Sequence, residues 1–136
     1  MTDATHPLPR PGVLVVDDEP MLRGLLDVIL RRRGFTVWTA DGGRSAVEVY
    51  QQNQSSISVV LLDVRMPGMD GPQTLAALKR VDPAVLCCFM TGHAGEYTAE
   101  NLLAQGAVRL FPKPFQVDEI GAALWQTAQL AGRRTG

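Results

Sequence analysis

The sequence predicts an α/β fold in which one parallel sheet is covered by helices on both faces. Two observations carry this prediction. Short continuous apolar runs, of which 13–16 and 57–62 are the clearest, are typical of strands buried on both faces. Each such run is followed by a stretch with apolar residues at helical spacing, and the alternation occurs five times along the chain. Alternating strands and helices favour right-handed crossovers between parallel strands.

The first strand and helix set the pattern. The apolar run 13–16 predicts a strand and ends at two aspartates. Pro20 follows at a position where a helix can begin, and apolar residues then recur at helical spacing as far as Leu30. The three arginines at 31–33 complement the negative end of the helix dipole, and Gly34 can end the helix. This unit therefore predicts a buried strand joined to an amphipathic helix.

The same alternation continues to the end of the chain. Further strands are expected at 35–40, 57–62, 84–90 and 108–111, and further helices at 43–52, 72–81, 98–105 and 117–130. The last helix has an apolar stripe made of Val117, Ile120, Leu124 and Ala128. Trp125 lies beside this stripe, where it could contact a partner or cover the edge of the core.

Length and composition indicate one globular domain. The chain has 136 residues, which is enough to bury a core without disulfides. We expect this domain at 12–131, between a flexible, proline-containing leader at 1–11 and a disordered tail at 132–136. Cys87 and Cys88 are adjacent in an apolar run, which favours two reduced, packed thiols over a redox pair.

Charge and hydropathy exclude some classes of partner. The formal net charge is -1, and a nucleic-acid-binding protein would usually be basic. No apolar run approaches the roughly 20 residues that span a bilayer, and the first residues lack the features of a signal peptide. The sequence therefore predicts a cytoplasmic protein that binds neither nucleic acid nor membrane.

Five polar side chains follow four of the predicted strands. Asp17 and Asp18 follow the first strand, Asp63 the third, Thr91 the fourth and Lys113 the fifth. Each residue alone has a structural explanation as a helix cap, a turn residue or a solvated loop charge. Ligands of open α/β sheets bind outside the carboxyl ends of the strands. The five together therefore predict a functional site at that edge.

Metal-assisted phosphoryl transfer to a carboxylate is the chemistry that fits this set. Three clustered carboxylates repel one another, so a cation must compensate them, and magnesium prefers oxygen ligands. A carboxylate that attacks phosphorus becomes an acyl phosphate, whose oxygens an ammonium and a hydroxyl can hold. We therefore expect one phosphoryl group among Asp63, Thr91 and Lys113, and Mg²⁺ or Mn²⁺ among Asp17, Asp18 and Asp63.

Four short motifs occur in the order and spacing of a known family. They are VLVVDDEP at 13–20, LLDVRMPGMDG at 61–71, MTGH at 90–93 and PKPF at 112–115. Together they resemble the receiver domain of two-component response regulators, the CheY-like superfamily. The resemblance extends over 12–130, which is nearly the whole chain.

The resemblance implies a fold and a set of roles. The fold would be a flavodoxin-like (βα)5 doubly wound sheet with strand order 2-1-3-4-5. Asp63 would accept the phosphoryl group, and a cis peptide bond before Pro114 would aim Lys113 at the site. The metal ligands would be Asp17, Asp18, Asp63 and the carbonyl of Arg65, and the phosphoryl-binding residues would be Thr91 and Lys113.

The resemblance also implies partners. A sensor histidine kinase or a phosphotransfer protein would donate the phosphoryl group, and phosphorylation would switch a surface that binds a downstream protein. A homodimer through the fourth helix, fifth strand and fifth helix is one form that this switch could take. Such a protein would be a signalling switch, not an enzyme, since it would catalyse only its own phosphoryl transfer and dephosphorylation.

The sequence departs from the family at Leu110, three residues before Lys113, where receivers usually carry tyrosine or phenylalanine. Phe111 is one residue later and should point to the opposite face of its strand. Leu110 either fills the position without consequence or alters the usual coupling between the threonine and the aromatic ring. In either case the signal could leave through the loop at 93–96, which Thr91 leads into.

Three other functions fit the sequence less well. An aspartate-nucleophile phosphatase needs an acid two residues after its nucleophile, and Arg65 stands at that position. A non-phosphorylated pseudo-receiver usually lacks the acidic pair, the acceptor or the lysine, and all are present. A helix-turn-helix domain does not fit after Leu130.

Arg65 and His93 each stand two residues beyond a site residue and should flank the phosphoryl group. We therefore expect Arg65→Ala or His93→Ala to change the lifetime of the phosphoryl group without abolishing phosphorylation.

Overall fold

The computed structural model has five parallel strands and five α-helices, as predicted. It describes residues 10–92, 97–113 and 115–135. The strands are β1 (Gly12–Val16), β2 (Thr36–Ala40), β3 (Val59–Asp63), β4 (Cys87–Thr91) and β5 (Arg109–Pro112). The helices are α1 (Pro20–Arg32), α2 (Gly43–Asn53), α3 (Gly71–Val81), α4 (Ala99–Ala104) and α5 (Val117–Thr135), with a 3-10 turn η1 (Gln54–Ser56) after α2.

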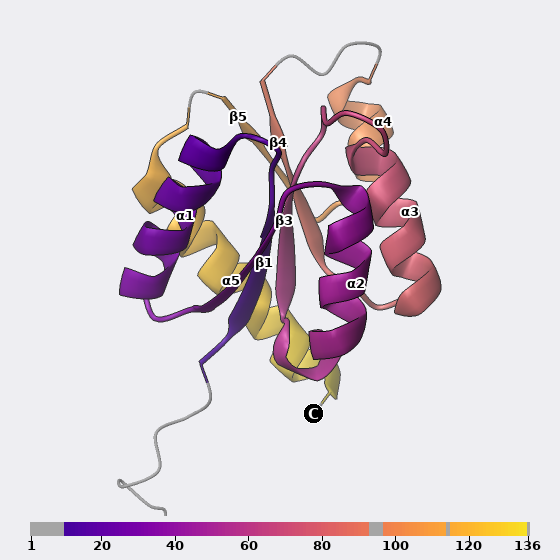
Figure 1. The fold of residues 1–136 in the computed structure, drawn as a ribbon. Helices are drawn as coiled ribbons and strands as arrows, with labels where there is room; N and C mark the ends of the chain where they lie inside the picture. Colours follow the sequence, from indigo (N-terminus) through magenta and orange to yellow (C-terminus); the bar gives the residue numbers. More distant parts are fainter. Residues whose placement is uncertain (1–9, 93–96, 114, 136) are drawn as a thin grey trace, which may run out of the picture.

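The sheet order is β2-β1-β3-β4-β5, which is the order that the resemblance implied. All four strand pairs are parallel. Helices α1 and α5 lie on one side of the sheet, and α2, α3 and α4 lie on the other (Figure 1). Among the residues that the structure describes, no helix combines the length and the hydrophobicity that crossing a bilayer requires.

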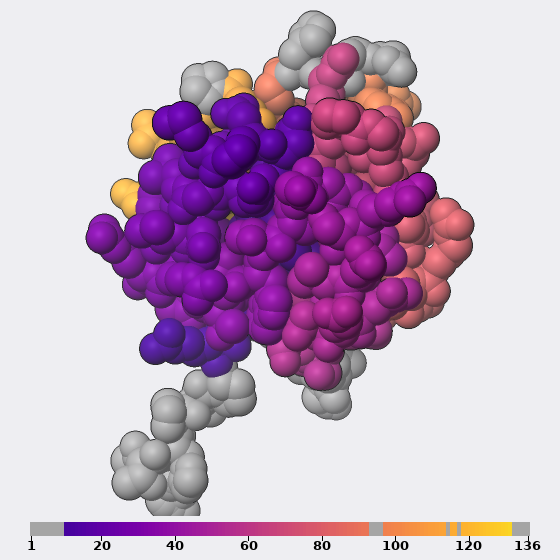
Figure 2. Space-filling model, viewed as in Figure 1, coloured from indigo at the N-terminus to yellow at the C-terminus, as the bar shows by residue number. Residues whose placement is uncertain are grey.

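Two apolar cores lie on the two faces of the sheet. Every residue of β1 and β3 is buried, which confirms the interpretation of their continuous apolar runs. Along β1, Leu14 and Val16 point into the core beneath α2, α3 and α4, whereas Val13 and Val15 point into the core beneath α1 and α5. Side chains from the first half of the chain cover most of the side seen in the space-filling view (Figure 2).

Several boundaries differ from the predicted ones. Strand β4 begins at Cys87, because a turn at Asp82, closed by a hydrogen bond from the Val85 amide to the Asp82 carbonyl, precedes it. Helix α5 continues to Thr135, so the expectation of a disordered tail at 132–136 was wrong for 132–135. A glycine costs only about 1 kcal/mol inside a helix, so the glycine at 132 need not end it.

The cysteines and Trp125 are where packing arguments placed them. Cys87 and Cys88 are free and buried, each in a different core, which confirms the prediction of packed thiols. Burial raises the pKa of both thiols. Trp125 is 37% exposed and sets its ring edge-to-face on Phe35 with centroids 5.4 Å apart. It therefore covers the edge of the core and still offers one face to solvent.

Candidate functional site

The predicted site residues lie at the carboxyl ends of four neighbouring strands. Asp17 comes directly after β1, and Lys113 comes directly after β5. Asp63 and Thr91 are the last residues of β3 and β4, so the strands include them and do not stop before them. The parallel ladder explains this difference, because the Val64 amide still donates to the Met90 carbonyl at 3.1 Å.

The structure brings four of the five side chains together. Lys113 Nζ lies 3.7 Å from Asp17 Oδ2 and 3.6 Å from Asp63 Oδ1. Carboxylate oxygens of Asp17, Asp18 and Asp63 lie within 4.8 Å of one another. Thr91 is half-buried beside them, and its carbonyl accepts a 2.7 Å hydrogen bond from the Lys113 amide. The strand ends therefore form the one cluster that the sequence predicts.

Asp17 has one oxygen with no hydrogen-bond partner. Its Oδ1 accepts a 2.7 Å hydrogen bond from the Glu19 amide, whereas Oδ2 is buried and unbonded among the described residues. Buried acceptors are rarely left unpaired, because they lose hydration without replacing it. Its nearest positive group, the ammonium of Lys113, lies at 3.7 Å, too far for a hydrogen bond. This oxygen therefore points to a missing cation.

The electrostatics of the site lead to the same conclusion. Burial and repulsion from Asp17 raise the pKa of Asp63 to about 6, and attraction to Lys113 only partly offsets them. Burial also raises the pKa of Asp17 above its usual range. Each carboxylate is thus costly to ionise in the fold as it stands. A divalent cation would favour the ionised forms, and the oxygen-rich donor set suits Mg²⁺.

The segment after β3 packs against the backbone of Asp63. Gly71 begins α3, and its amide donates to the Val64 carbonyl at 2.8 Å. A Cβ atom on Gly71 would lie 2.6 Å from the Asp63 carbonyl oxygen, so only glycine fits there. Asp70 caps α3 in a reciprocal capping box with Gln73. The end of β3 and the start of α3 are therefore packed directly against each other.

Two contacts at this edge were not anticipated from the sequence. Tyr97 donates a 2.8 Å hydrogen bond from its hydroxyl to Asp70 Oδ2, which ties the segment before α4 to α3. Arg23 donates from Nη1 to the Asp17 carbonyl at 2.7 Å. The capping-box spacing of Asp70 and Gln73 could have marked Asp70. No local pattern marks Tyr97, because its partner is distant in the chain.

The remaining expectations about the site have mixed outcomes. Leu110 packs into the core beneath α2, α3 and α4, whereas Phe111 packs into the opposite core, as their positions on one strand predict. Arg65 is exposed. The loop at 93–96, including His93, and Pro114 lie outside the described residues, as do 1–9 of the leader and Gly136.

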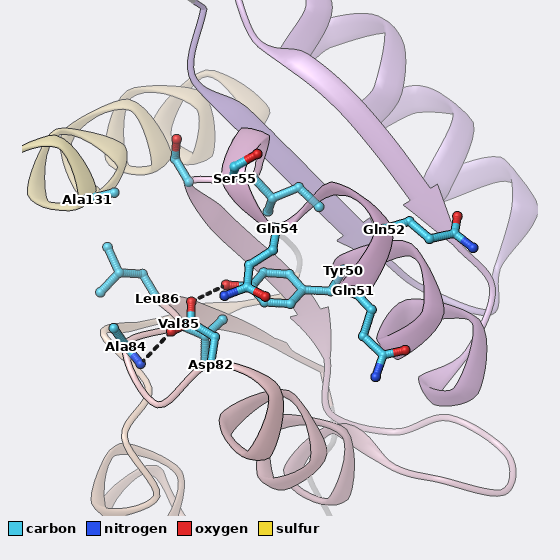
Figure 3. Close-up of a pocket in the computed structure, with 12 residues that line it drawn as sticks. Tyr50, Gln51, Gln52, Gln54, Ser55, Asp82, Ala84, Val85, Leu86 and Ala131 are labelled. Atoms are coloured by element: carbon cyan, nitrogen blue, oxygen red, sulfur yellow. Dashed lines mark hydrogen bonds between the residues drawn. The ribbon is translucent and has the colours of Figure 1, made fainter. Parts of the chain in front are cut away.

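Two hollows of the surface lie at opposite ends of the parallel strands. We call these two ends the carboxyl edge and the amino edge of the sheet. One of about 320 Å³ adjoins the site and is lined by the segment from Val64 to Gly68 together with Asp70 and Tyr97. Another of about 720 Å³ lies at the amino edge, between the end of α2 and the turn before β4 (Figure 3). Asp82 in the larger hollow has both carboxylate oxygens hydrogen-bonded, whereas Asp17 at the carboxyl edge has its Oδ2 unbonded among the described residues.

Comparison with known proteins identifies the family. The model of the response regulator receiver domain matches residues 13–125. Sensor kinase CckA of Brucella abortus is 34% identical over 82% of this chain and 12% of its own length. Sporulation initiation phosphotransferase F of Bacillus subtilis is 31% identical over 82% of this chain and 89% of its own length.

Solved structures agree with this assignment. The receiver domain protein of Clostridium thermocellum superimposes with a TM-score of 0.80 at 26% identity, covering 92% of this chain and 96% of that one. Seven curated relatives, including the sensor kinase, are longer proteins of which this chain spans 12% to 37%. The fold, the order of its strands and the family match agree, and the chain belongs to the family of response regulator receiver domains.

Proposed function

We propose that the chain is a phosphorylation-activated switch that accepts a phosphoryl group on Asp63. One observation carries the proposal. Asp63 is buried beside Asp17 and 3.6 Å from the ammonium of Lys113, at the sheet edge where α/β proteins bind ligands. A buried carboxylate with a second carboxylate and an ammonium beside it suits a nucleophile that needs both a cation and a phosphate-binding group.

The transfer step follows from these groups. An oxygen of the Asp63 carboxylate attacks phosphorus, and a new P–O bond forms. The bond from phosphorus to the donor breaks, and its electron pair leaves with the donor, which is an imidazole nitrogen of phosphohistidine or the oxygen of a small acyl phosphate. Lys113 binds one phosphoryl oxygen as a point charge, and the Thr91 hydroxyl donates to another.

Asp17, Asp18, Asp63 and the carbonyl of Arg65 are the groups that would hold Mg²⁺ or Mn²⁺. The unbonded, buried Oδ2 of Asp17 and the clustered carboxylate oxygens fit such an ion. When bound, the ion neutralises negative charge on the phosphoryl oxygens. Exposed Arg65 is free to influence how water reaches the acyl phosphate, so the effect of Arg65→Ala on phosphoryl lifetime stays a prediction.

The partners that we propose are those of the family. The donor is a sensor histidine kinase or a phosphotransfer protein, and the similarity to a sensor kinase and to a phosphotransferase supports both. The output is a protein-binding surface, with the face of α4, β5 and α5 as one candidate for homodimerisation. The protein acts as a switch and not as an enzyme. A pseudo-receiver is less favoured, because the acidic pair, Asp63 and Lys113 stand together.

Phosphorylation by a small-molecule donor tests the proposal. The purified chain is incubated with acetyl phosphate, with Mg²⁺ or with EDTA, and its intact mass is measured. We expect one added phosphoryl group with Mg²⁺, none with EDTA and none in Asp63→Asn. Asp82→Asn is the matched control, because this aspartate lies at the opposite edge of the sheet, and it should label like the original chain. Full labelling of Asp63→Asn, or labelling that ignores Mg²⁺, would contradict the proposal.

A further inference from the structure

The side chain of Arg23 reaches from α1 back to the turn that carries the acidic pair. Its Nη1 donates to the Asp17 carbonyl at 2.7 Å, and its amide donates to the Glu19 carbonyl at 3.0 Å. The side chain of Arg23 therefore ties the start of the Asp17–Glu19 turn to α1, and the backbone bond to Glu19, which most residues would make here, closes the first turn of the helix. Because the guanidinium is half-buried and charged, its bond to the carbonyl is stronger than one between neutral groups.

Every polar atom of Asp17 except one is fixed by a hydrogen bond. The amide donates to the Ala40 carbonyl at 3.2 Å, the carbonyl accepts from Arg23, and Oδ1 accepts from the Glu19 amide at 2.7 Å. Only Oδ2 has no such bond, and it faces Lys113 in the acidic cluster. Among these three bonds, the one from Arg23 is the one that a side-chain substitution can remove while Asp17 itself is kept.

The other bonds that hold this turn come from backbone amides, and no helix-capping side chain adds to them. Glu19 is the residue that precedes α1, and its side chain makes no capping hydrogen bond. The neighbouring carboxylates Asp18 and Asp63 repel the Asp17 carboxylate, so a loose turn would let it move away from them. A tie to the backbone of Asp17 therefore opposes a repulsion that acts before any cation is bound.

We propose that Arg23 is a positioning residue for the metal site, which holds Asp17 so that its Oδ2 remains aimed at the bound cation. This inference rests on the proposed function, because the cation is the one that phosphoryl transfer requires. The side chain of Arg23 donates to the backbone carbonyl of Asp17. It acts through the Asp17 backbone, and residues that orient metal ligands commonly affect affinity as strongly as weak ligands do.

The charge of Arg23 and its position predict opposite effects on cation binding. A positive group near an acidic cluster repels Mg²⁺, so if charge were decisive, removing it would tighten binding. If positioning is decisive, removing it weakens binding, because Asp17 is no longer held in place. The direction of the change in the dissociation constant therefore separates the two explanations.

Arg31 offers a matched control on the same helix. Its Nη2 donates to the Val37 carbonyl at 3.0 Å, so it also ties α1 to the backbone of a neighbouring segment. It lies in the last turn of α1, away from the acidic cluster, and pairs with Asp27. Arg31→Met should therefore change the stability of the fold without changing its affinity for Mg²⁺.

The experiment is a Mg²⁺ titration by calorimetry and a Mn²⁺ titration by electron paramagnetic resonance, on the full chain without donor. We expect Arg23→Met to weaken binding of both ions about tenfold. Arg23→Lys, which keeps the charge and one donor, should lie between Arg23→Met and the original chain. Arg31→Met should bind like the original chain, and circular dichroism shows whether each variant is folded. If Arg23→Met does not fold, the affinity of Arg23→Lys for the two ions decides whether the inference holds.

Labelling with acetyl phosphate gives the second measurement. In Arg23→Met the Mg²⁺ concentration for half-maximal rate should rise about tenfold, while the rate at saturating Mg²⁺ stays close to the original. Equal or tighter Mg²⁺ binding by a folded Arg23 variant would overturn the inference while the original chain still binds and labels. If the original chain neither binds Mg²⁺ nor labels, the proposed function fails and the inference fails with it.

Discussion

The two edges of the sheet use aspartate in opposite ways. At the amino edge, Asp82 accepts a 2.7 Å hydrogen bond from the Tyr50 hydroxyl and a 3.0 Å bond from the Ala84 amide, so both of its oxygens have partners (Figure 3). At the carboxyl edge, Asp17 has one buried oxygen without a hydrogen-bond partner among the described residues, and Asp63 lies beside it with a raised pKa. The aspartate at the amino edge is fully hydrogen-bonded, and we propose that a cation completes the site at the carboxyl edge.

This difference shows how a functional site can be separated from a structural one. Both edges contain an aspartate and a surface hollow, and the larger hollow is at the structural edge. Volume alone would select the wrong place. Unsatisfied charge selects the carboxyl edge, because natural folds tolerate local violations of polar satisfaction mainly where a ligand relieves them.

Removing the structural aspartate should give the largest change in stability. Asp82→Ala deletes the acceptor of two hydrogen bonds, and we expect a loss of about 3 kcal/mol in the free energy of unfolding in urea. Mg²⁺ affinity should not change, because Asp82 lies at the far edge. A double-mutant cycle with Tyr50→Phe isolates the coupling between the two side chains. A loss of less than about 0.5 kcal/mol would mean that the amino edge does not need this aspartate.

Neutralising Asp63 should instead stabilise the fold. In the fold, burial and repulsion from Asp17 raise the pKa of Asp63 to about 6, whereas an unperturbed aspartate in the unfolded chain has a pKa of 3.8. The folded protein therefore binds this proton more tightly, and ionised Asp63 reduces stability above pH 6. Without Mg²⁺, Asp63→Asn should stabilise the fold by about 2 kcal/mol at pH 7.5.

The pH dependence provides the check on that prediction. As the pH falls from 6 towards 4, Asp63 becomes protonated in the original chain, and the advantage of Asp63→Asn should disappear. Urea unfolding at several pH values measures this difference in the free energy of unfolding between Asp63→Asn and the original chain. A stabilisation that persists unchanged at pH 4, or a destabilisation at pH 7.5, would show that Asp63 is not held in an unfavourable charged state.

The smallest expected effects concern two similar tyrosine–aspartate bonds. Tyr50 contacts Asp82 at the end of α3, and Tyr97 contacts Asp70 at its start. Tyr50 is 2% exposed and Tyr97 is half-buried, so Tyr50→Phe should cost about 1.5 kcal/mol and Tyr97→Phe less than about 1 kcal/mol. Thermal unfolding measures both losses of stability. Equal losses in Tyr50→Phe and Tyr97→Phe would contradict the prediction that the more buried bond contributes more.

Much of the fold and the site could be predicted from the sequence. The buried runs of β1 and β3 and the helical spacing of α1 are local signals. The polar residues that follow the predicted strands indicated that Asp17, Asp63 and Lys113 would lie together. The end of α5 was missed, because no proline stops the helix and the glycine there costs little.

Other contacts could not be predicted, because they join residues that are brought together only by the tertiary structure. Tyr97 and Asp70 are separated by 27 positions, and Tyr50 and Asp82 by 32. The bond from Arg23 to the Asp17 carbonyl joins residues only six positions apart, yet a backbone acceptor leaves no mark in the sequence. The unbonded oxygen of Asp17 likewise depends on how closely the strands pack around it.

The most direct test of the contrast between the edges is the effect of Mg²⁺ on the free energy of unfolding. With Mg²⁺ at about ten times its dissociation constant, the original chain should gain about 1.4 kcal/mol in urea unfolding at pH 7.5. Asp82→Asn should gain the same amount, because its edge binds no ion, whereas Asp17→Asn should gain almost nothing. Equal gains in the original chain and in Asp17→Asn, or no gain in either, would contradict the account.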